Sequence, residues 1–327
     1  MEQAEAAGRT TGTFEAESFL MDTAVTQKVC GAQAEAAYRK AVAELGRLEG
    51  LLSFFLPTSD IARINANAGK ARVEVHRETR AVLECAQRFS GLSESAFDVT
   101  LAPLIDLWRR RGGEGRVPAQ DEIEQALSCV GMRFLELRGD TAYLSREGCA
   151  IDLGGIAKGY AADRCIELYR ANGVGSAFVN LGGNVKVLGE AEGGRRWAIG
   201  LQHPDEPRGT CFGLLLMSGR SVVTSGGYER YVVVDGRRYH HILDPRTGRP
   251  VESGLKAATV VCEDSMAADA LSTAAYVRGL DEGLALVAAQ TDTDAVFVTE
   301  KNEVLVTRGL KDCFQALRQT GLTCSFV

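Results

Sequence analysis

Short apolar segments joined by two-residue turns constrain the fold of this chain more than any other feature. Gly139-Asp140 lies between two such segments, and Asp235-Gly236 separates Tyr231–Val234 from Arg238–Ile242. Turns of this composition accept the positive φ angles that tight hairpins need, and they join antiparallel neighbours. The sequence therefore predicts several antiparallel hairpins.

Amphipathic segments with apolar residues at helical spacing are mixed with these hairpins. The expected helices are Gly31–Glu49, a short turn after Ser59, Glu78–Phe89, Pro103–Arg110, Pro118–Val130, Gly155–Asn172, Ser265–Val277, Leu280–Gln290 and Lys311–Arg318. Further strands are expected at Phe14–Val29, Ala177–Asn180, Val185–Leu188, Trp197–Leu201, Cys211–Met217, Ala258–Cys262, Ala295–Thr299 and Val304–Thr307. Because strands and helices do not alternate strictly, the pattern favours an α+β fold with mainly antiparallel strands.

The length and composition indicate one large globular unit. The chain has 327 residues, of which 45% are hydrophobic and 24% are charged, enough for a sizeable core. No internal repeat or long linker is visible, so we expect a disordered tail over residues 1–13 and one domain over residues 14–327. The net charge of −6 provides no general attraction to nucleic acid, and no apolar run reaches the length of a membrane span.

The cysteines and the N-terminal residues bear on the cellular compartment. Nine cysteines are scattered singly, without a CxxC pair, and an odd number argues against a complete disulfide framework. We expect most of them to be small buried side chains in a reducing compartment. No signal peptide or lipobox is visible, so a cytoplasmic location is expected, with export as a lipoprotein the alternative if a signal has been removed.

A double glycine precedes one of the expected helices. In Ile151–Tyr160, Gly154-Gly155 is followed by Lys158 in the first helical turn. A helix N-terminus with open backbone N–H groups favours an anion, and Lys158 would add a cation for a phosphate group. The segment matches neither a Walker loop nor GxGxxG, so an ordinary structural turn is the alternative.

Two further glycine pairs follow along the chain. Asn180–Asn184 predicts a tight hairpin with a left-handed glycine. Thr224–Tyr228 combines the hydroxyl of Ser225 with two glycines, and we expect a loop there. Such a loop can bind phosphate or ribose, although serine–glycine loops are also common without any ligand.

An adjacent pair of histidines stands at the end of an expected strand. His240 and His241 would face opposite ways on an extended strand, which argues against a metal site built from both. One of them can act as an acid, a base or an orienting group, and a hydrogen-bonded structural histidine is an equal alternative.

Two more patterns carry oxygen ligands. Asp269 and Thr273 stand four residues apart on an expected helix, so both side chains share one face. A carboxylate with a hydroxyl suits Mg²⁺, whereas a solvated aspartate and a threonine bonded to its own backbone are the alternative. Asp98 precedes the Pro103–Arg110 helix, where it or Thr100 can simply be an N-terminal cap.

The order of these motifs resembles that of the ApbE-type FAD:protein FMN transferases, over residues 18–300. The most specific segments are Asp152-Leu-Gly-Gly-Ile-Ala-Lys-Gly-Tyr160, His241-Ile-Leu-Asp-Pro245 and Ala268-Asp-Ala-Leu-Ser-Thr273. The resemblance implies a single α+β domain of the flavin-transferase, T-fold-like type. It also implies an enzyme that splits FAD at its pyrophosphate, attaches FMN to a Thr or Ser hydroxyl of an acceptor flavoprotein and releases AMP.

The resemblance assigns roles to particular residues. Asp269, Thr273 and the backbone carbonyl of Ala157 would hold Mg²⁺, and His241 matches the histidine that is important for transfer in the family. Which of His241 and Asp269 acts as the general base stays open. The FAD site would be lined by Met21, Phe55, Ala96, Phe97, Asp98, Gly154, Tyr160 and Ile242.

Two positions depart from the family pattern. Met21-Asp22-Thr23 replaces the common Met-Gly-Thr, which adds a carboxylate near the expected flavin pocket. Phe55 replaces the usual tyrosine, so a ring remains for stacking but its hydroxyl is lost. Hydrolysis of FAD to FMN and AMP, and flavin binding without catalysis, are the alternative functions; the acceptor is expected to be a respiratory or reductase subunit with an FMN-binding domain.

Overall fold

The computed structural model describes residues 12–318 and 320–327, and it confirms the α+β class. A nine-stranded sheet runs through the molecule in the order β1-β2-β6-β7-β10-β13-β14-β15-β17. Its neighbours are antiparallel except for β15 and β17, which are parallel. Most of the expected tail lies outside the described residues, and the first strand already begins at Thr13.

The strands of this sheet are β1 (Thr13–Leu20), β2 (Thr23–Cys30), β6 (Ser176–Leu181), β7 (Asn184–Leu188), β10 (Ser221–Gly226), β13 (Leu255–Cys262), β14 (Asp294–Thr299), β15 (Glu303–Val306) and β17 (Thr323–Phe326). One smaller sheet consists of β3 (Val73–Glu74), β5 (Thr141–Leu144) and β4 (Leu135–Arg138). A second consists of β16 (Phe314–Ala316), β9 (Cys211–Met217) and β8 (Trp197–Gln202), and β11 (Tyr231–Val234) forms a separate hairpin with β12 (Arg237–His240).

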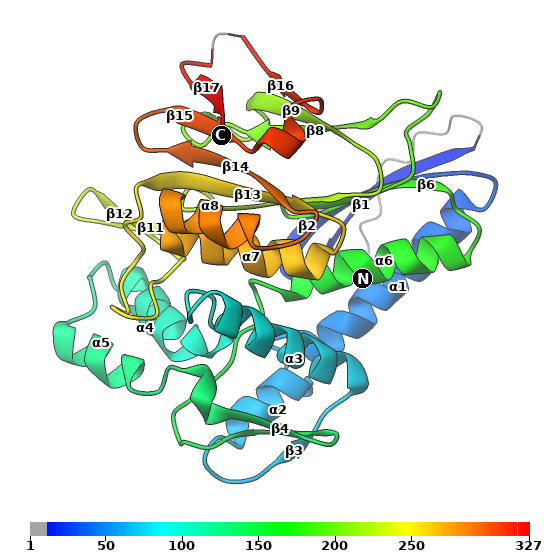
Figure 1. Cartoon of the computed structure of the whole chain (residues 1–327). Coiled ribbons are helices and arrows are strands. Elements are labelled where there is room, and N and C mark those ends of the chain that lie inside the picture. Colours follow the sequence, from blue (N-terminus) through cyan, green and yellow to red (C-terminus); the bar gives the residue numbers. More distant parts are fainter. Residues whose placement is uncertain (1–11, 319) are drawn as a thin grey trace.

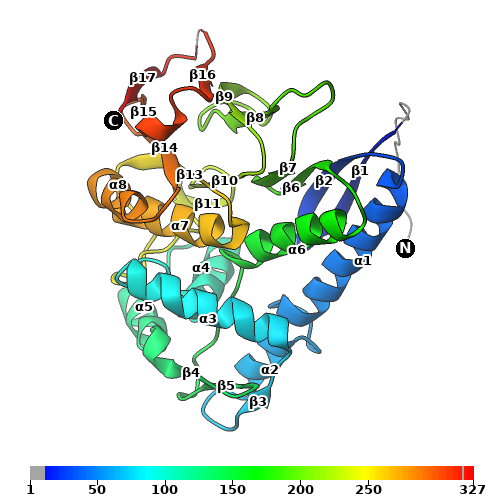
Figure 2. The ribbon, with the colours of Figure 1, turned by 45° about the vertical axis from the view of Figure 1, so that its right-hand side comes forward.

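Helices cover one face of the large sheet and extend into a second layer below it (Figure 1). The helices are α1 (Ala34–Leu52), α2 (Asp60–Ala66), α3 (Arg77–Leu92), α4 (Ala102–Gly113), α5 (Gln120–Leu127), α6 (Ala157–Ala171), α7 (Ser265–Arg278) and α8 (Leu280–Ala288), with short 3₁₀ turns at Val99–Leu101, Met132–Phe134 and Arg308–Leu310. Helices α1, α6, α7 and α8 lie against the sheet, whereas α2–α5 and the β3-β5-β4 sheet form the lower layer (Figure 2).

The opposite face of the large sheet is covered by the β16-β9-β8 sheet. Apolar side chains from both sheets form one buried cluster there, and they include Ile199, Leu215 and Val296. A second cluster joins α1 and α6 to β2 and β6, and a third joins α7 to the lower layer. Because the large sheet is apolar on both faces, it is the rigid centre to which the polar elements described below are attached.

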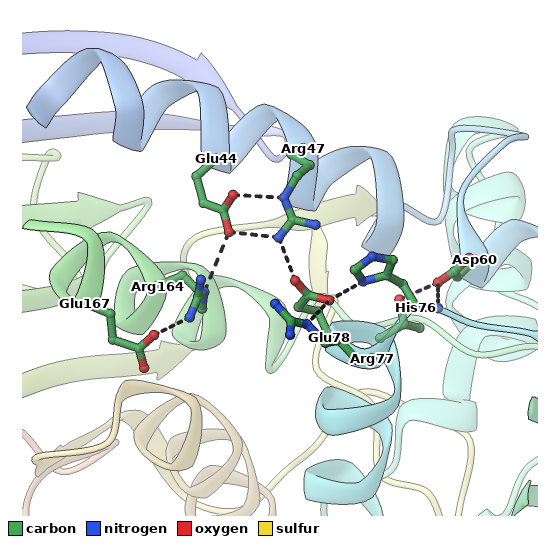
Figure 3. Close-up of polar contacts among 9 residues, drawn as sticks. Glu44, Arg47, Asp60, His76, Arg77, Glu78, Arg164 and Glu167 are labelled. Carbon is green, nitrogen blue, oxygen red and sulfur yellow. Dashed lines mark hydrogen bonds and ion pairs between the residues drawn. The ribbon is translucent and has the colours of Figure 1, made fainter. Parts of the chain in front are cut away.

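Charged side chains tie the upper helices to the lower layer (Figure 3). Arg47 of α1 donates to Glu44 at 2.9 Å and to Glu78 of α3 at 2.8 Å, and Glu44 also pairs with Arg164 of α6. Burial raises the pKa of Glu78, but hydrogen bonds from its own backbone, Arg47 and His76 outweigh burial and lower the pKa overall. Glu78 is therefore ionised at neutral pH and holds α3 against α1.

Several local expectations were wrong. The segment Phe14–Val29 is two strands, because Met21 and Asp22 form a turn between them, and this turn contains no glycine that would mark it in the sequence. The expected helix at Lys311–Arg318 is instead a turn at 311–313 that leads into β16, where Phe314 is buried and pairs with Leu215 of β9.

The region around the histidines also differs from expectation. The expected loop at Thr224–Tyr228 begins inside β10, which pairs with β7 and β13. Strand β12 ends at His240, so His241 lies just beyond it. Helix α4 continues to Gly113, three residues beyond the expected end at Arg110. Tertiary pairing overrode the local turn signals at these places.

Candidate active site at the start of α6

The first turn of α6 and the double glycine before it are the centre of the candidate site. The amide of Gly154 donates to Asp152 Oδ1 at 2.7 Å, which closes the turn. A side chain on Gly155 would lie 3.2 Å from the buried ring of Phe97 and 3.6 Å from Thr273 Oγ1. Both glycines have negative φ angles, so Gly155 is needed for space and not for a left-handed turn.

Helices α6 and α7 meet at their N-terminal turns. Gly159 permits this approach, because a Cβ there would lie 2.3 Å from the carbonyl oxygen of Ser265. The amide of Gly159 donates to Asp269 Oδ2 at 2.9 Å, which satisfies one of the free N–H groups at the start of α6. Asp269 is only 4% exposed, and its Oδ1 has no hydrogen-bond partner among the described residues.

A directed chain of hydroxyl groups stands beside this carboxylate. Ser272 Oγ donates to the carbonyl oxygen of Asp269 at 3.0 Å, so its single proton is used. Ser225 must therefore donate to Ser272 at 2.9 Å, and Thr273 must donate to Ser225 at 3.0 Å. The lone pairs of Thr273 Oγ1 remain available to a ligand.

These oxygens fit a hard divalent cation. Asp269 Oδ1 offers a negative charge, Thr273 Oγ1 offers lone pairs one helical turn later, and Ala157 begins α6. No group of three or more His, Cys, Asp or Glu side chains suited to a metal occurs in the described part of the chain. A single carboxylate with neutral oxygens matches Mg²⁺, which keeps several of its ligands from water or from substrate phosphates.

The same arrangement changes the role expected of Ser225. Its hydroxyl is committed to Ser272 and Thr273, so it orients a candidate metal ligand and does not point an unused donor at phosphate or ribose. Sequence reasoning missed Ser272 and the spacer Gly159, although the Ala-Asp-Ala-Leu-Ser-Thr and Lys-Gly-Tyr segments contained both.

His241 and Lys158 contribute the remaining polar groups. The Nδ1 of His241 lies 3.0 Å from the carbonyl oxygen of Arg230. Desolvation, reinforced by the positive charges of Arg230 and Lys158, lowers the pKa of His241 to about 4. Because a carbonyl only accepts, Nδ1 carries the proton, and Nε2 of the neutral ring keeps its lone pair. The ring retains solvent contact, and Lys158 Nζ donates to the carbonyl oxygen of Gly154 at 2.5 Å.

His240 and His241 have different surroundings. His240 Nε2 lies 3.0 Å from the carbonyl oxygen of Val251, and the His240 ring packs edge-on against Tyr276 with 5.8 Å between ring centroids. Burial lowers the pKa of His240. His240 is thus a structural residue, and only His241 is available to a ligand.

The structural alternative holds for Asp98. Its Oδ1 accepts from the amide of Thr100 at 2.7 Å and from the Thr100 hydroxyl at 2.5 Å, so it caps the 3₁₀ turn at Val99–Leu101. Burial raises the pKa of Asp98, although these hydrogen bonds oppose the shift. Its neighbour Phe97 is directed at Gly155, as described above, and Ala96 packs at the edge of the same apolar cluster.

The other expected flavin-lining residues lie on different elements. Met21 and Tyr160 are half-buried where two apolar clusters meet, and Ile242 is buried. Phe55 is 60% exposed on the loop after α1, where the guanidinium of Arg109 lies 5.6 Å from the ring centroid. Among the described residues, the ring of Phe55 contacts Phe54, with 5.3 Å between ring centroids, and Arg109, and it remains an exposed ring on the loop.

The site brings together a free carboxylate oxygen, an oriented hydroxyl and a helix N-terminus on an α+β fold. This combination defines a class of protein that is equipped to bind a cation together with phosphate groups. None of the helices within the described ranges has the length and apolarity to cross a membrane. The chain belongs to the ApbE family, whose model matches residues 21–297.

Similar proteins agree with this assignment. The chain is 38% identical over 262 residues to a FAD:protein FMN transferase of Klebsiella pneumoniae, covering 80% of this chain and 81% of the relative. It is 35% identical over 311 residues to the FAD:protein FMN transferase of Treponema pallidum, covering 90% and 85%. The solved structure of the ApbE protein from Thermotoga maritima superposes with a TM-score of 0.84 at 32% identity, covering 92% of this chain and 99% of that one. The flavin transferase ApbE from Vibrio cholerae gives a TM-score of 0.82 at 25% identity, covering 95% and 100%.

Proposed function

We propose that this protein transfers FMN from FAD to a Thr or Ser hydroxyl of an acceptor flavoprotein, releases AMP and depends on Mg²⁺. The observation that carries the proposal is that Asp269 and Thr273 stand one turn apart on α7, with Asp269 bound through Oδ2 to the first turn of α6 and the Thr273 hydroxyl oriented by Ser225. The names of the relatives support the flavin substrate and the protein acceptor.

Charge neutralisation is the first requirement of this chemistry. A pyrophosphate resists attack until its negative charge is reduced. Asp269, Thr273 and the carbonyl of Ala157 would hold Mg²⁺, which when bound supplies that neutralisation and orients the leaving phosphate. The N-terminus of α6 and Lys158 add positive potential on the same side.

His241 is the better candidate for the general base. Asp269 already accepts the Gly159 amide and lies where the cation would bind, whereas Nε2 of His241 has a free lone pair. The acceptor oxygen forms a bond to the phosphorus of the FMN moiety, the bond from that phosphorus to the bridging oxygen breaks, and AMP leaves with the bonding electrons. The proton of the hydroxyl passes to His241 Nε2.

The flavin itself would be held by apolar side chains around this turn. Met21, Phe97, Tyr160 and Ile242 supply the buried surface, and Ala96 leaves room beside Phe97. The exposed ring of Phe55 is free to cover the isoalloxazine, with stacking as its contribution.

Intact-protein mass spectrometry tests the proposal. We would incubate the protein with FAD, Mg²⁺ and an FMN-binding domain of a respiratory or reductase subunit. Transfer adds about 438 Da to the acceptor, the mass of FMN less one water. AMP release at the same rate without acceptor would instead indicate FAD hydrolysis, and flavin binding without AMP release would indicate a non-catalytic protein.

A further inference from the structure

The turn between β1 and β2 contains an aspartate where glycine is easier to accommodate. Met21 and Asp22 have φ angles of 55° and 58°, the left-handed region used by the tightest hairpins. Aspartate is one of the few non-glycine residues that adopt this conformation, although glycine does so at lower cost. The turn itself does not require a carboxylate, so any role of the Asp22 carboxylate must lie in its contacts.

Those contacts lead to Arg230, which precedes β11. One guanidinium nitrogen of Arg230 donates to the backbone carbonyl of Asp22 at 3.2 Å and lies 3.4 Å from its carboxylate. Both side chains are 63% exposed, and exposed ion pairs contribute little to stability. The pair links two hairpins without being needed to hold the core together.

Arg230 in turn holds His241. Its carbonyl oxygen accepts the backbone amide of His241 at 3.1 Å and lies 3.0 Å from Nδ1 of the ring. The position of this carbonyl therefore fixes both the orientation of the ring and its tautomer. A shift of the Arg230 backbone therefore also moves Nε2, and the contacts of the guanidinium with Asp22 tie Arg230 to the β1–β2 turn.

We propose that Asp22 is a positioning residue, which anchors Arg230 so that the His241 ring presents Nε2 to the reacting hydroxyl. This inference rests on the proposed function, in which His241 accepts that proton. It extends the function to a residue that contacts neither the flavin nor the cation in the account above. Asp22 is expected to act on the rate of transfer and not on the affinity for FAD.

The test is the Asp22→Gly variant, measured for kcat, KM for FAD and melting temperature. Glycine relieves the left-handed strain, so the melting temperature should stay the same or rise. The variant removes the carboxylate and keeps the backbone carbonyl that also accepts from Arg230, so the anchor is weakened; kcat should fall by about threefold or more while KM for FAD changes by less than about twofold. A loss of kcat together with a rise in melting temperature is not what a merely structural residue would give.

The chain provides a matched control at Asp292. This aspartate also has a positive φ, 53°, and its carbonyl and carboxylate both bind one arginine, Arg220. Neither residue contacts His241 in the described structure, so Asp292→Gly should leave kcat unchanged. Equal losses of kcat in Asp22→Gly and Asp292→Gly would overturn the proposal, as would an unchanged kcat in Asp22→Gly.

Two further measurements complete the test. The charge-swapped double variant Asp22→Arg with Arg230→Asp keeps the Arg230 backbone position and should recover part of the lost kcat; a double variant no better than Asp22→Gly would contradict the ion-pair anchor. Nitrogen NMR of His241 should show the Nδ1–H tautomer in the unmodified protein and a mixture in Asp22→Gly. The same tautomer in both proteins would refute the positioning role of Asp22. Because this measurement does not depend on transfer, failure of the positioning role can be distinguished from failure of the proposed function.

Discussion

The contact between α6 and α7 makes a sharp prediction for Gly159→Ala. The added methyl group would lie 2.3 Å from the carbonyl oxygen of Ser265 and 2.7 Å from Met266 Cα. Both are backbone atoms, so no side-chain rotation relieves the clash, and the two helices must separate by about 1 Å. That separation stretches the hydrogen bond from the Gly159 amide to Asp269, and it moves Asp269 and Thr273, which are both on α7, away from the first turn of α6.

The magnitude follows from three opposing contributions. Overpacking costs about 1–3 kcal/mol, and loss of a hydrogen bond to a charged group costs about 1.5–3 kcal/mol. Alanine returns up to about 1 kcal/mol of helix propensity. We expect a net destabilisation of about 1.5–5 kcal/mol, which for a chain of 327 residues is a fall in melting temperature of roughly 2–7 °C, and a higher Mg²⁺ concentration for half-maximal transfer.

Gly46→Ala is the matched control, because Gly46 lies within α1 and a Cβ there has no atom within 4 Å. It should raise stability by up to about 1 kcal/mol and leave the Mg²⁺ requirement unchanged. Calorimetry and Mg²⁺ titration of both variants provide the comparison. If Gly159→Ala matched Gly46→Ala in both measurements, the reasoning about the helix contact would be refuted.

Three other predictions follow from the same structure. Asp269→Asn keeps an acceptor for the Gly159 amide but removes the negative charge, so transfer should fall at least about a hundredfold while FAD fluorescence titration still shows binding; unaltered turnover would contradict the cation role. The pKa of His241 is lowered to about 4, so as pH falls from about 6.5 to 4 the unfolded chain takes up a proton that the folded protein does not. The free energy of unfolding should therefore decline over that window, while His241 stays able to act as the base in transfer. An NMR titration of His241 with a midpoint near 6.5 would contradict this prediction. Lys186→Met leaves the carboxylate of Asp163, which lies on α6 and accepts the Ser265 and Met266 amides at the start of α7, without its cationic partner. The substitution should cost about 3–5 kcal/mol in a denaturant titration, and a cost below about 1 kcal/mol would count against this role.

Much of the fold was predictable because local and tertiary preferences agree. The two-residue turns at Asp235-Gly236 and Gly182-Gly183 have positive φ angles, and both close hairpins as expected. Ser59 caps α2 by accepting the amide of Ala62 at 3.0 Å. Where a turn used unsuitable residue types, as at Met21-Asp22, the hairpin was invisible in the sequence.

The candidate site was only partly predictable. The spacing of Asp269 and Thr273 placed both on one face of a helix, and the structure confirms that helix as α7. The Gly159 contact and the direction of the hydroxyl chain depend on how two distant helices meet, which no local pattern encodes. At Asp98 the family pattern predicted a residue that lines the flavin site, whereas in the structure its Oδ1 caps the following 3₁₀ turn by accepting from Thr100.

The mass of an acceptor domain after incubation with FAD tests the central claim most directly. With Mg²⁺ present, the account predicts a covalent gain of about 438 Da on a Thr or Ser and one AMP released for each acceptor modified. The same reaction with chelator, or with the Asp269→Asn variant, should leave the acceptor mass unchanged. An unmodified acceptor in the complete reaction, or equal modification without Mg²⁺, would contradict the account.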